Sequence, residues 1–246
     1  MFKIFSRSKR EANPVFSLLG TDMHSHLKPG NDDGSQDLAT SVQLVKGKAE
    51  LGYKKIITTP HIMRDMYKNS PDTILPGLDR LREAVKTKGI EIEINAAAEY
   101  FLDEDTEELL KNNKKLLTIS GNMVLAEFSL AWQPHNIKDM LFELQMQGYQ
   151  PVIAHPERYI YLQQNKAFYE ELKDAGCYFQ LNILSLGGHY GKSVQELAQY
   201  LVKKKYYDLA GTDLHHAGHL QALNTPGVTQ PLQKLLDSGA LKNRDL

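Results

Sequence analysis

The sequence contains very little cysteine, and this excludes several classes of protein. Cys177 is the only cysteine among the 246 residues, so the chain forms no internal disulfide and we expect a reducing, cytoplasmic environment. The residues after Cys177 form a strand-like run without glycine or arginine. A cysteine-dependent phosphatase needs an anion-binding loop there, closed by an arginine. We therefore interpret Cys177 as a buried thiol of the core.

Long apolar runs and an excess of charge of either sign are also lacking. No stretch approaches the roughly 18 apolar residues of a membrane span, so we do not expect an integral membrane protein. The formal net charge of −1 at pH 7 gives no reason to expect a nucleic-acid partner. The glycine-rich GxxxxGK[ST] loop that binds nucleotide phosphates is absent, which disfavours nucleotide-driven phosphoryl transfer.

The apolar residues that are present predict strands alternating with helices. About seven strand-like runs are separated by helical stripes, several of which end at a glycine such as Gly52, Gly89 or Gly148. Alternation of this kind predicts a parallel sheet, open or closed. We expect strands near Asp22 and at 54–59, 91–97, 123–128, 150–154, 177–183 and 207–212, and helices around 38–49, 74–85, 105–112, 137–144, 168–175, 194–202 and 231–236.

The length and composition suit a single domain. A chain of 246 residues with 41% apolar and 24% charged residues is ordinary for one α/β barrel. No linker, repeat or low-complexity segment divides the sequence. We assign residues 20–246 to the barrel and residues 1–19 to a short basic tail.

Side chains able to bind metals follow most of the expected strands. His24 and His26 stand two residues apart, and alternation along a strand places them on the same face. An HxH pair alone is a weak indication, but other expected strands also end in such residues. In a β/α barrel the carboxyl ends of the strands form the rim that carries the active site. This placement favours a closed or nearly closed barrel over an open, doubly wound sheet.

The candidate ligands are too numerous for one ion. A catalytic zinc-type site uses about three protein ligands and keeps one position open, so this set suggests two or three ions with a bridging carboxylate. Nitrogen and oxygen ligands without thiolate suit Mn, Fe or Zn. Two ions roughly 3.5–4 Å apart favour phosphoester hydrolysis, because they clamp the attacking and leaving oxygens. The candidates are His24, His26, Asp33, His61, Glu99, Glu127, His155, Asp213 and His215.

Several short motifs occur in order along residues 20–223: DMHSH at 22–26, DDG at 32–34, TTPH at 58–61, AEY at 98–100, EF at 127–128, AHPER at 154–158 and TDLHH at 212–216. Together they closely resemble the polymerase-and-histidinol-phosphatase (PHP) superfamily. Within it, DDG after HSH and the HPER tetrapeptide are similar to the bacterial manganese-dependent protein-tyrosine phosphatases encoded with capsule and exopolysaccharide machinery. The resemblance implies a distorted TIM-like (β/α)7 barrel of the PHP type and two or three metal ions, with Mn expected first.

The resemblance also implies how the ligands divide among the ions. One ion would be held by four residues, of which Glu99 bridges to the second ion, and three residues would hold the third. Behind the ligands, we expect Asp32 to shape the loop or support a ligand, and Asp22 to orient a histidine. The implied division is His24, His26, Glu99 and Asp213 for the first ion, Glu127 and His155 for the second, and Asp33, His61 and His215 for the third.

Arg158 of the HPER motif corresponds to the arginine that family members place against the phosphate. Its fork of donors suits bidentate binding of a phosphoryl group. The alternative is a purely structural role, in which Arg158 forms a salt bridge with Glu157. Capsule-type members often carry a further arginine shortly after the last DxH motif, where this chain has Ala217-Gly218-His219. His219 would be a weaker substrate contact, with a pH dependence that arginine lacks.

Three functions remain open at this point, because the fold alone does not determine the reaction. By resemblance, the first is a protein-tyrosine phosphatase acting on the tyrosine-rich tail of a membrane-bound bacterial tyrosine kinase that controls polysaccharide export. The second is a small-molecule phosphatase for histidinol phosphate or a sugar phosphate, which a closed pocket would favour. The third is a non-catalytic regulator that binds a kinase. Such a protein would have lost some of the metal ligands, but here every expected ligand position is filled.

Overall fold

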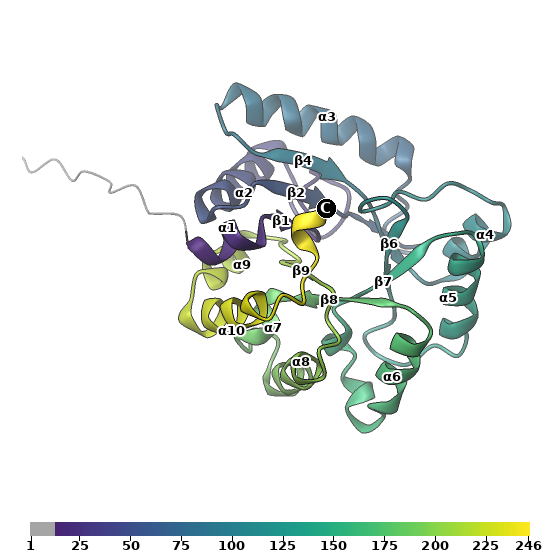
Figure 1. The fold of residues 1–246 in the computed structure, drawn as a ribbon. Coiled ribbons are helices and arrows are strands. Elements are labelled where there is room, and N and C mark those ends of the chain that lie inside the picture. The colour runs from purple at the N-terminus through teal and green to yellow at the C-terminus, as the bar shows by residue number, and fades with distance from the viewer. Residues whose placement is uncertain (1–12) are drawn as a thin grey trace, which may run out of the picture.

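A curled parallel sheet forms the centre of the structure, which is a computed structural model and describes residues 13–246 (Figure 1). All strands pair in parallel and form two adjoining sheets. The smaller sheet has the order β1 (Thr21–Asp22), β2 (Lys55–Thr58), β4 (Glu93–Ala96). The larger has the order β3 (His61–Ile62), β5 (Glu99–Phe101), β6 (Met123–Glu127), β7 (Gln150–Ala154), β8 (Tyr178–Asn182), β9 (Leu209–Gly211).

Two of the expected strands are each followed by a second short piece. The run at 54–59 is interrupted at Pro60, which has no N–H for the strand ladder, and resumes as β3. The run at 91–97 resumes as β5. The first pieces pair with each other through Lys55 and Glu93, and the second pieces pair through His61 and Glu99. Each break therefore sets a candidate ligand at the first position of a new strand.

The barrel closes between β1 and β9 without a regular strand pair. Ser25 and Leu214 form an isolated parallel bridge at the carboxyl end. Toward the other end, Asn243 takes the place of a strand, since its Nδ2 donates to Thr21 O (2.9 Å) and to Ala210 O (2.7 Å). Its Oδ1 accepts from Ala210 N at 2.9 Å. A ring of parallel strands with helices outside confirms the predicted barrel class.

Helices surround the sheet (Figure 1). Helix α2 (Leu38–Leu51) is capped by the Asp37 side chain at its N-terminus and ends at Gly52, whose φ of 112° suits glycine. Within residues 13–246 we find no helix with the length and apolar character needed to cross a bilayer. The helices are α1 (Pro14–Leu19), α2 (Leu38–Leu51), α3 (Pro71–Thr87), α4 (Glu104–Lys111), α5 (Ile137–Met146), α6 (Ala167–Asp174), α7 (Ile183–Leu186), α8 (Lys192–Lys204), α9 (Ala217–Leu223) and α10 (Pro226–Asp237), with 3-10 turns η1 (Pro156–Arg158), η2 (Ile160–Gln164) and η3 (Asn243–Asp245).

The first of these helices corrects the expected extent of the basic tail. Residues 14–19, which we assigned to the tail, form α1, and its Val15, Phe16 and Leu19 are buried in the main core. Asn13 caps the helix, and Pro14 occupies its first turn, where a missing N–H does no harm. The helix is only six residues long, too short for its apolar periodicity to be visible. Residues 1–12 lie outside the described residues.

The interior of the barrel is filled with apolar side chains rather than open. One cluster joins residues from strands around the ring: Met23, Ile57, Ala97, Leu125, Val152, Ala154 and Leu209. The main core packs the helices against the outside of the sheet and contains Cys177. Cys177 is buried in this core, which confirms the prediction, and burial raises the pKa of its thiol to about 11.

Candidate metal centre

The predicted ligands converge on one rim of the barrel, at the carboxyl ends of the strands. The atoms of neighbouring groups lie close together: His24 Nε2 is 3.0 Å from Glu99 Oε2, and His155 Nε2 is 3.2 Å from Glu99 Oε1. The structure therefore brings all of the predicted ligands into one cluster. His24 and His26 follow β1, Asp33 lies in the loop before α2, His61 lies in β3, Glu99 in β5, Glu127 in β6, His155 after β7, and Asp213 and His215 after β9.

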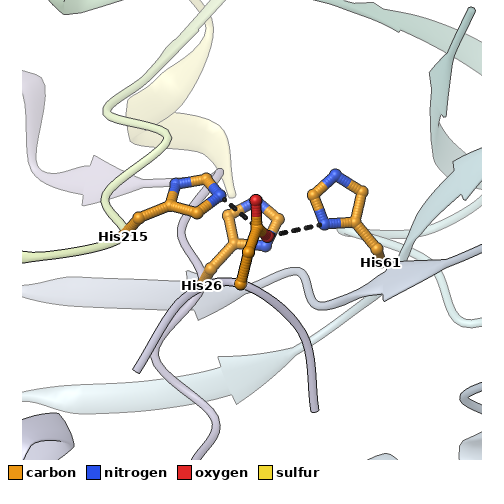
Figure 2. A group of neighbouring side chains, drawn as sticks. His26, His61 and His215 are labelled. Carbon is orange, nitrogen blue, oxygen red and sulfur yellow. Dashed lines mark ion pairs between the residues drawn. The ribbon is translucent and has the colours of Figure 1, made fainter. Parts of the chain in front are cut away.

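Within the cluster, four overlapping groups have ligand atoms within 4.8 Å of one another. Figure 2 shows the imidazoles of one group, His26, His61 and His215, turned toward a common centre. Glu99 belongs to two groups, as a bridging carboxylate would. His26 joins the group expected for the third ion, so the groups do not map one to one onto the implied division. The groups are His26, Asp33, His61, His215; His24, His26, Asp213; His24, Glu99, His155; and His61, Glu99, Glu127.

The electrostatics of the cluster fit a bound cation. Burial would lower the pKa of His61, but the nearby Glu99 carboxylate raises it to about 10. Burial would likewise raise the pKa of Glu99, but His24 and His61 hold it well below its usual range. Nearby carboxylates likewise raise the pKa of His24 and His26 against the effect of burial, and the protons favoured on these imidazoles compete with a divalent ion for the same nitrogens. His155 Nδ1 is also buried without a hydrogen-bond partner.

Asp32 supports two of the ligands, as expected. Its Oδ2 lies 2.7 Å from His26 Nδ1 and accepts from the His61 backbone N–H at 3.0 Å. Burial alone would raise the pKa of Asp32, but His26 holds it far below its usual range. A carboxylate behind an imidazole fixes the ring and leaves Nε2 facing the site.

Gln180, on β8, is a supporting residue that the sequence interpretation missed. Its Oε1 lies 2.9 Å from His24 Nδ1 and also accepts from the His155 backbone N–H at 3.1 Å. As an acceptor, it favours the tautomer with a proton on His24 Nδ1, which leaves Nε2 free for a metal. The available signal in the sequence was a glutamine within the apolar run of the expected strand at 177–183, and in the structure this side chain is fully buried.

Asp22 has a different role from the expected one. It pairs with the buried Lys48 of α2 and accepts from Thr212 N at 2.8 Å and Thr212 Oγ1 at 2.7 Å. None of its described contacts is with a histidine, so the expectation that Asp22 orients one is wrong. It instead ties β1, β9 and α2 together beneath the ligands.

Arg158 lies in η1, directly after the His155 strand end, and faces the cluster. Its Nη1 donates to Asp213 Oδ2 at 2.8 Å, and its guanidinium lies 4.8 Å from the centre of the Tyr190 ring. Glu157 is not its partner, because that carboxylate is buried and accepts from Asn182 N (2.9 Å) and from Tyr207. The alternative that Arg158 forms a salt bridge with Glu157 is therefore wrong.

Arg158 and the ligands border an open pocket of about 340 Å³, which we call the site pocket. His219 lies in its wall, and burial lowers the His219 pKa to about 4. Any titration of His219 thus falls near pH 4, not near neutrality as for an ordinary histidine. The lining residues are Asp33, His61, Glu127, Leu130, His155, Arg158, Tyr190, Asp213, His215, His216 and His219.

Two of the predicted ligands have a backbone conformation that residues other than glycine seldom adopt. His155 has a φ of 31° and Asp213 a φ of 50°, and both directly follow or closely follow a barrel strand. Residues other than glycine in this region carry strain, which persists where the surrounding structure enforces it and is frequent at functional sites. The strain coincides here with the two residues that flank Arg158.

Known proteins with similar sequences are phosphatases. The chain is 29% identical over 195 residues to the tyrosine-protein phosphatase YwqE of Bacillus subtilis, which covers 79% of this chain and 77% of YwqE. It is 28% identical over 200 residues to the tyrosine-protein phosphatase CpsB of Streptococcus pneumoniae, covering 79% and 82%.

Solved structures agree with the barrel. A crystal structure from work on YwqE of Bacillus subtilis and CpsB of Streptococcus pneumoniae, described as unique metal-dependent tyrosine phosphatases, matches with a TM-score of 0.75 and 27% identity, over 88% of this chain and 94% of that one. A phosphotriesterase homology protein of Escherichia coli matches with a TM-score of 0.54 at 15% identity, over 92% and 94%, and supports the fold alone.

The family described as capsular polysaccharide synthesis, CpsB/CapC, matches residues 20–233. This range contains all the motifs on which the resemblance to capsule-type metal-dependent phosphatases was based, and the resemblance is confirmed. The chain belongs to the CpsB/CapC family.

Proposed function

We propose that the protein is a metal-dependent phosphatase that hydrolyses phosphotyrosine in proteins. The observation that carries the proposal is the site pocket, where a dense cluster of imidazoles and carboxylates faces Arg158. The names of YwqE and CpsB as tyrosine-protein phosphatases give the substrate class. A cysteine nucleophile is excluded by the burial of Cys177.

We further propose that the predicted ligands hold two or three divalent ions. Imidazole and carboxylate ligands without thiolate suit Mn, Fe or Zn, and the resemblance to manganese-dependent phosphatases makes Mn the first candidate. The groups within 4.8 Å of one another give the candidate sites, and Glu99, which belongs to two of them, would be the bridging carboxylate. When bound, such ions would polarise the phosphoryl oxygens and make water more acidic.

Arg158 would bind the phosphoryl group. Asp213 and the Tyr190 ring hold its guanidinium at the edge of the site pocket. Only Nη1 is used by Asp213, so the other donors of the fork can meet phosphoryl oxygens. The leaving group would be a phenolate with a pKa of about 10, which needs less help from a proton donor than an alkoxide does.

The partner we propose is the phosphotyrosine tail of a membrane-bound bacterial tyrosine kinase, met in the cytoplasm. Membership of a capsular polysaccharide synthesis family supports a regulatory role in that pathway, and the single cysteine suits a reducing compartment. The pocket also suits a tail, because it is open and bordered by exposed residues such as Asp33 and His216.

The experiment is steady-state hydrolysis of a phosphotyrosyl peptide and of histidinol phosphate by protein that is either loaded with manganese or treated with chelator. We expect metal-dependent turnover that favours the peptide. Asp213→Ala should lose bound metal and activity, while Asp213→Asn tests the charge and keeps a residue that tolerates positive φ. Preference for histidinol phosphate would instead indicate a small-molecule phosphatase of metabolism. Full activity of Asp213→Ala would show that the assignment of the metal site is wrong.

A further inference from the structure

Three large apolar side chains are exposed on the connections that follow β6 and β7, at the rim that carries the site pocket. Trp132, the only tryptophan of the chain, is 67% exposed, and Leu130 and Ile160 are also exposed. We call these three residues the apolar rim. Contiguous exposed apolar surface is uncommon on soluble proteins and marks interaction sites, and tryptophan is enriched among residues that dominate binding.

The apolar rim lies on the same two connections that supply Leu130 and Arg158 to the site pocket. Leu130 lines the pocket directly, and Trp132 follows Glu127 by five positions, which an extended chain spans in about 18 Å at most. Ile160 comes two residues after Arg158. The neighbouring Tyr161 hydroxyl donates to Ser129 O at 2.9 Å and so ties η2 to the Trp132 loop.

The Trp132 loop is held in place by its own buried residues. Ser129 is buried, and its Oγ accepts from the backbone N–H of Ala131 at 3.2 Å and of Trp132 at 3.4 Å. The preceding Phe128 is fully buried and donates its N–H to the Tyr159 hydroxyl at 3.0 Å. Trp132 is therefore presented to solvent from a fixed backbone, which reduces the entropy that binding would cost.

We propose that the apolar rim binds apolar side chains that flank the phosphotyrosine of a protein substrate. The inference rests on the proposed function and adds the part of the substrate that is recognised. With the phosphate at Arg158, a residue up to four positions from the phosphotyrosine lies within about 14 Å along the peptide. The rim then favours peptides over free phosphotyrosine through the affinity for the substrate, not through the chemical step.

The first test compares Trp132→Ala with the wild-type protein on three substrates, all with the metal-loaded enzyme. They are a phosphotyrosyl peptide with leucine or phenylalanine near the phosphotyrosine, the same peptide with serine there, and free phosphotyrosine. We expect the KM of the apolar peptide to rise about tenfold in the variant, with kcat unchanged. The other two substrates should change less than twofold.

Met146→Ala is the matched control. Met146 is also 67% exposed, but it ends α5 just before the amino end of β7, on the side of the barrel away from the site pocket. We expect wild-type kinetics on all three substrates. A KM rise in Met146→Ala equal to that in Trp132→Ala would overturn the assignment to this rim.

The single tryptophan gives a second readout. A peptide containing phosphonomethyl-phenylalanine, which cannot be hydrolysed, should shift the fluorescence of the wild-type protein to shorter wavelength, and the free amino acid should not. An unchanged KM in Trp132→Ala, or equal losses on peptide and free phosphotyrosine, would refute the inference while leaving the proposed function intact. No hydrolysis of any phosphotyrosine substrate by wild-type protein would overturn both.

Discussion

Asp213 links the candidate metal centre to Arg158 through its two oxygens. Oδ1 lies 3.4 Å from His24 Nε2 and 3.3 Å from His26 Nε2. Oδ2 accepts from Arg158 Nη1 at 2.8 Å and from Asn182 Nδ2 at 3.0 Å. One carboxylate thus faces the ligands on one side and fixes the arginine on the other, so the position of Arg158 follows from that of the metal site.

Replacing Arg158 with lysine should separate phosphate binding from metal binding. Lysine keeps the positive charge beside Asp213 but lacks the planar fork that holds two phosphoryl oxygens. We expect kcat/KM for a phosphotyrosyl peptide to fall about 10- to 100-fold, which is roughly 1.4–2.7 kcal/mol of transition-state stabilisation. Bound metal, measured by elemental analysis, should remain at the wild-type level. An unchanged kcat/KM would remove the phosphate role.

Some residues of the candidate site could be predicted from the sequence, and others could not. Most of the predicted ligands form one cluster because they stand at or just after the end of an expected strand, a position that alternation and periodicity reveal, whereas Asp33 reaches the cluster from the loop before α2. Gln180 was not predicted, because its role depends on the rotation of β8 that brings one polar side chain behind two histidines from other strands. Asp22 was recognised as important, but its partner Lys48 lies on a helix and the pair is visible only after packing.

Among the elements, the joint between β1, β9 and α2 is the part of the barrel that depends most on side chains. Lys48 Nζ pairs with Asp22 and lies 2.6 Å from Thr212 Oγ1, and Lys48 and Asp22 are fully buried. Thr212 precedes Asp213, and Asp22 lies two residues before His24. The buried network therefore sets the relative position of two strands that supply ligands.

Breaking this network on one side should destabilise the fold strongly. Lys48→Met leaves the Asp22 carboxylate buried without its counter-charge, for which about 3–5 kcal/mol is expected. Asp22→Asn combined with Lys48→Met removes both charges and keeps an acceptor for Thr212 N. We expect the double variant to recover most of the loss in urea-unfolding measurements. Equal destabilisation of the single and double variants would mean that the charges are not coupled.

The element boundaries show a similar limit of the sequence. The long amphipathic helices were predicted, but β3 and β5 were not, since two or three residues carry no periodicity. Helix α1 was assigned to the tail for the same reason. These short pieces are stabilised by tertiary contacts, such as the pairing of His61 with Glu99, which local propensity does not describe.

At the scale of the whole molecule, closure of the barrel was predicted from where the ligands fall, but the means of closure was not. No pattern in the sequence places Asn243 between β1 and β9, where it forms hydrogen bonds with Thr21 and Ala210. A residue more than 200 positions from Thr21 thus replaces part of a strand pair. Closure brings β1 beside β9 and so joins ligands from both ends of the chain in one centre.

The pH dependence of global stability should report the buried network as a property of the whole fold. Burial lowers the pKa of Lys48 to about 8, although Asp22 opposes the shift, and an unfolded lysine has a pKa of about 10.4. Between these values the unfolded chain holds a proton that the folded protein has lost. The free energy of unfolding should therefore rise with pH above about 8, by up to about 1.4 kcal/mol per pH unit.

The rise of the free energy of unfolding with pH should end near pH 10, because buried tyrosines make this free energy fall as the pH increases further. Burial raises the pKa of Tyr159 and of Tyr207 well above the usual value, so ionisation of the unfolded chain reduces stability above about pH 10. Urea unfolding of wild-type protein between pH 7.5 and 10 isolates the Lys48 contribution when the Asp22→Asn, Lys48→Met double variant is measured in parallel. The free energy of unfolding of the wild-type protein minus that of the double variant should increase with pH. Parallel curves would mean that Lys48 keeps its proton in the folded protein, in which case the ion pair with Asp22 outweighs the cost of burying it.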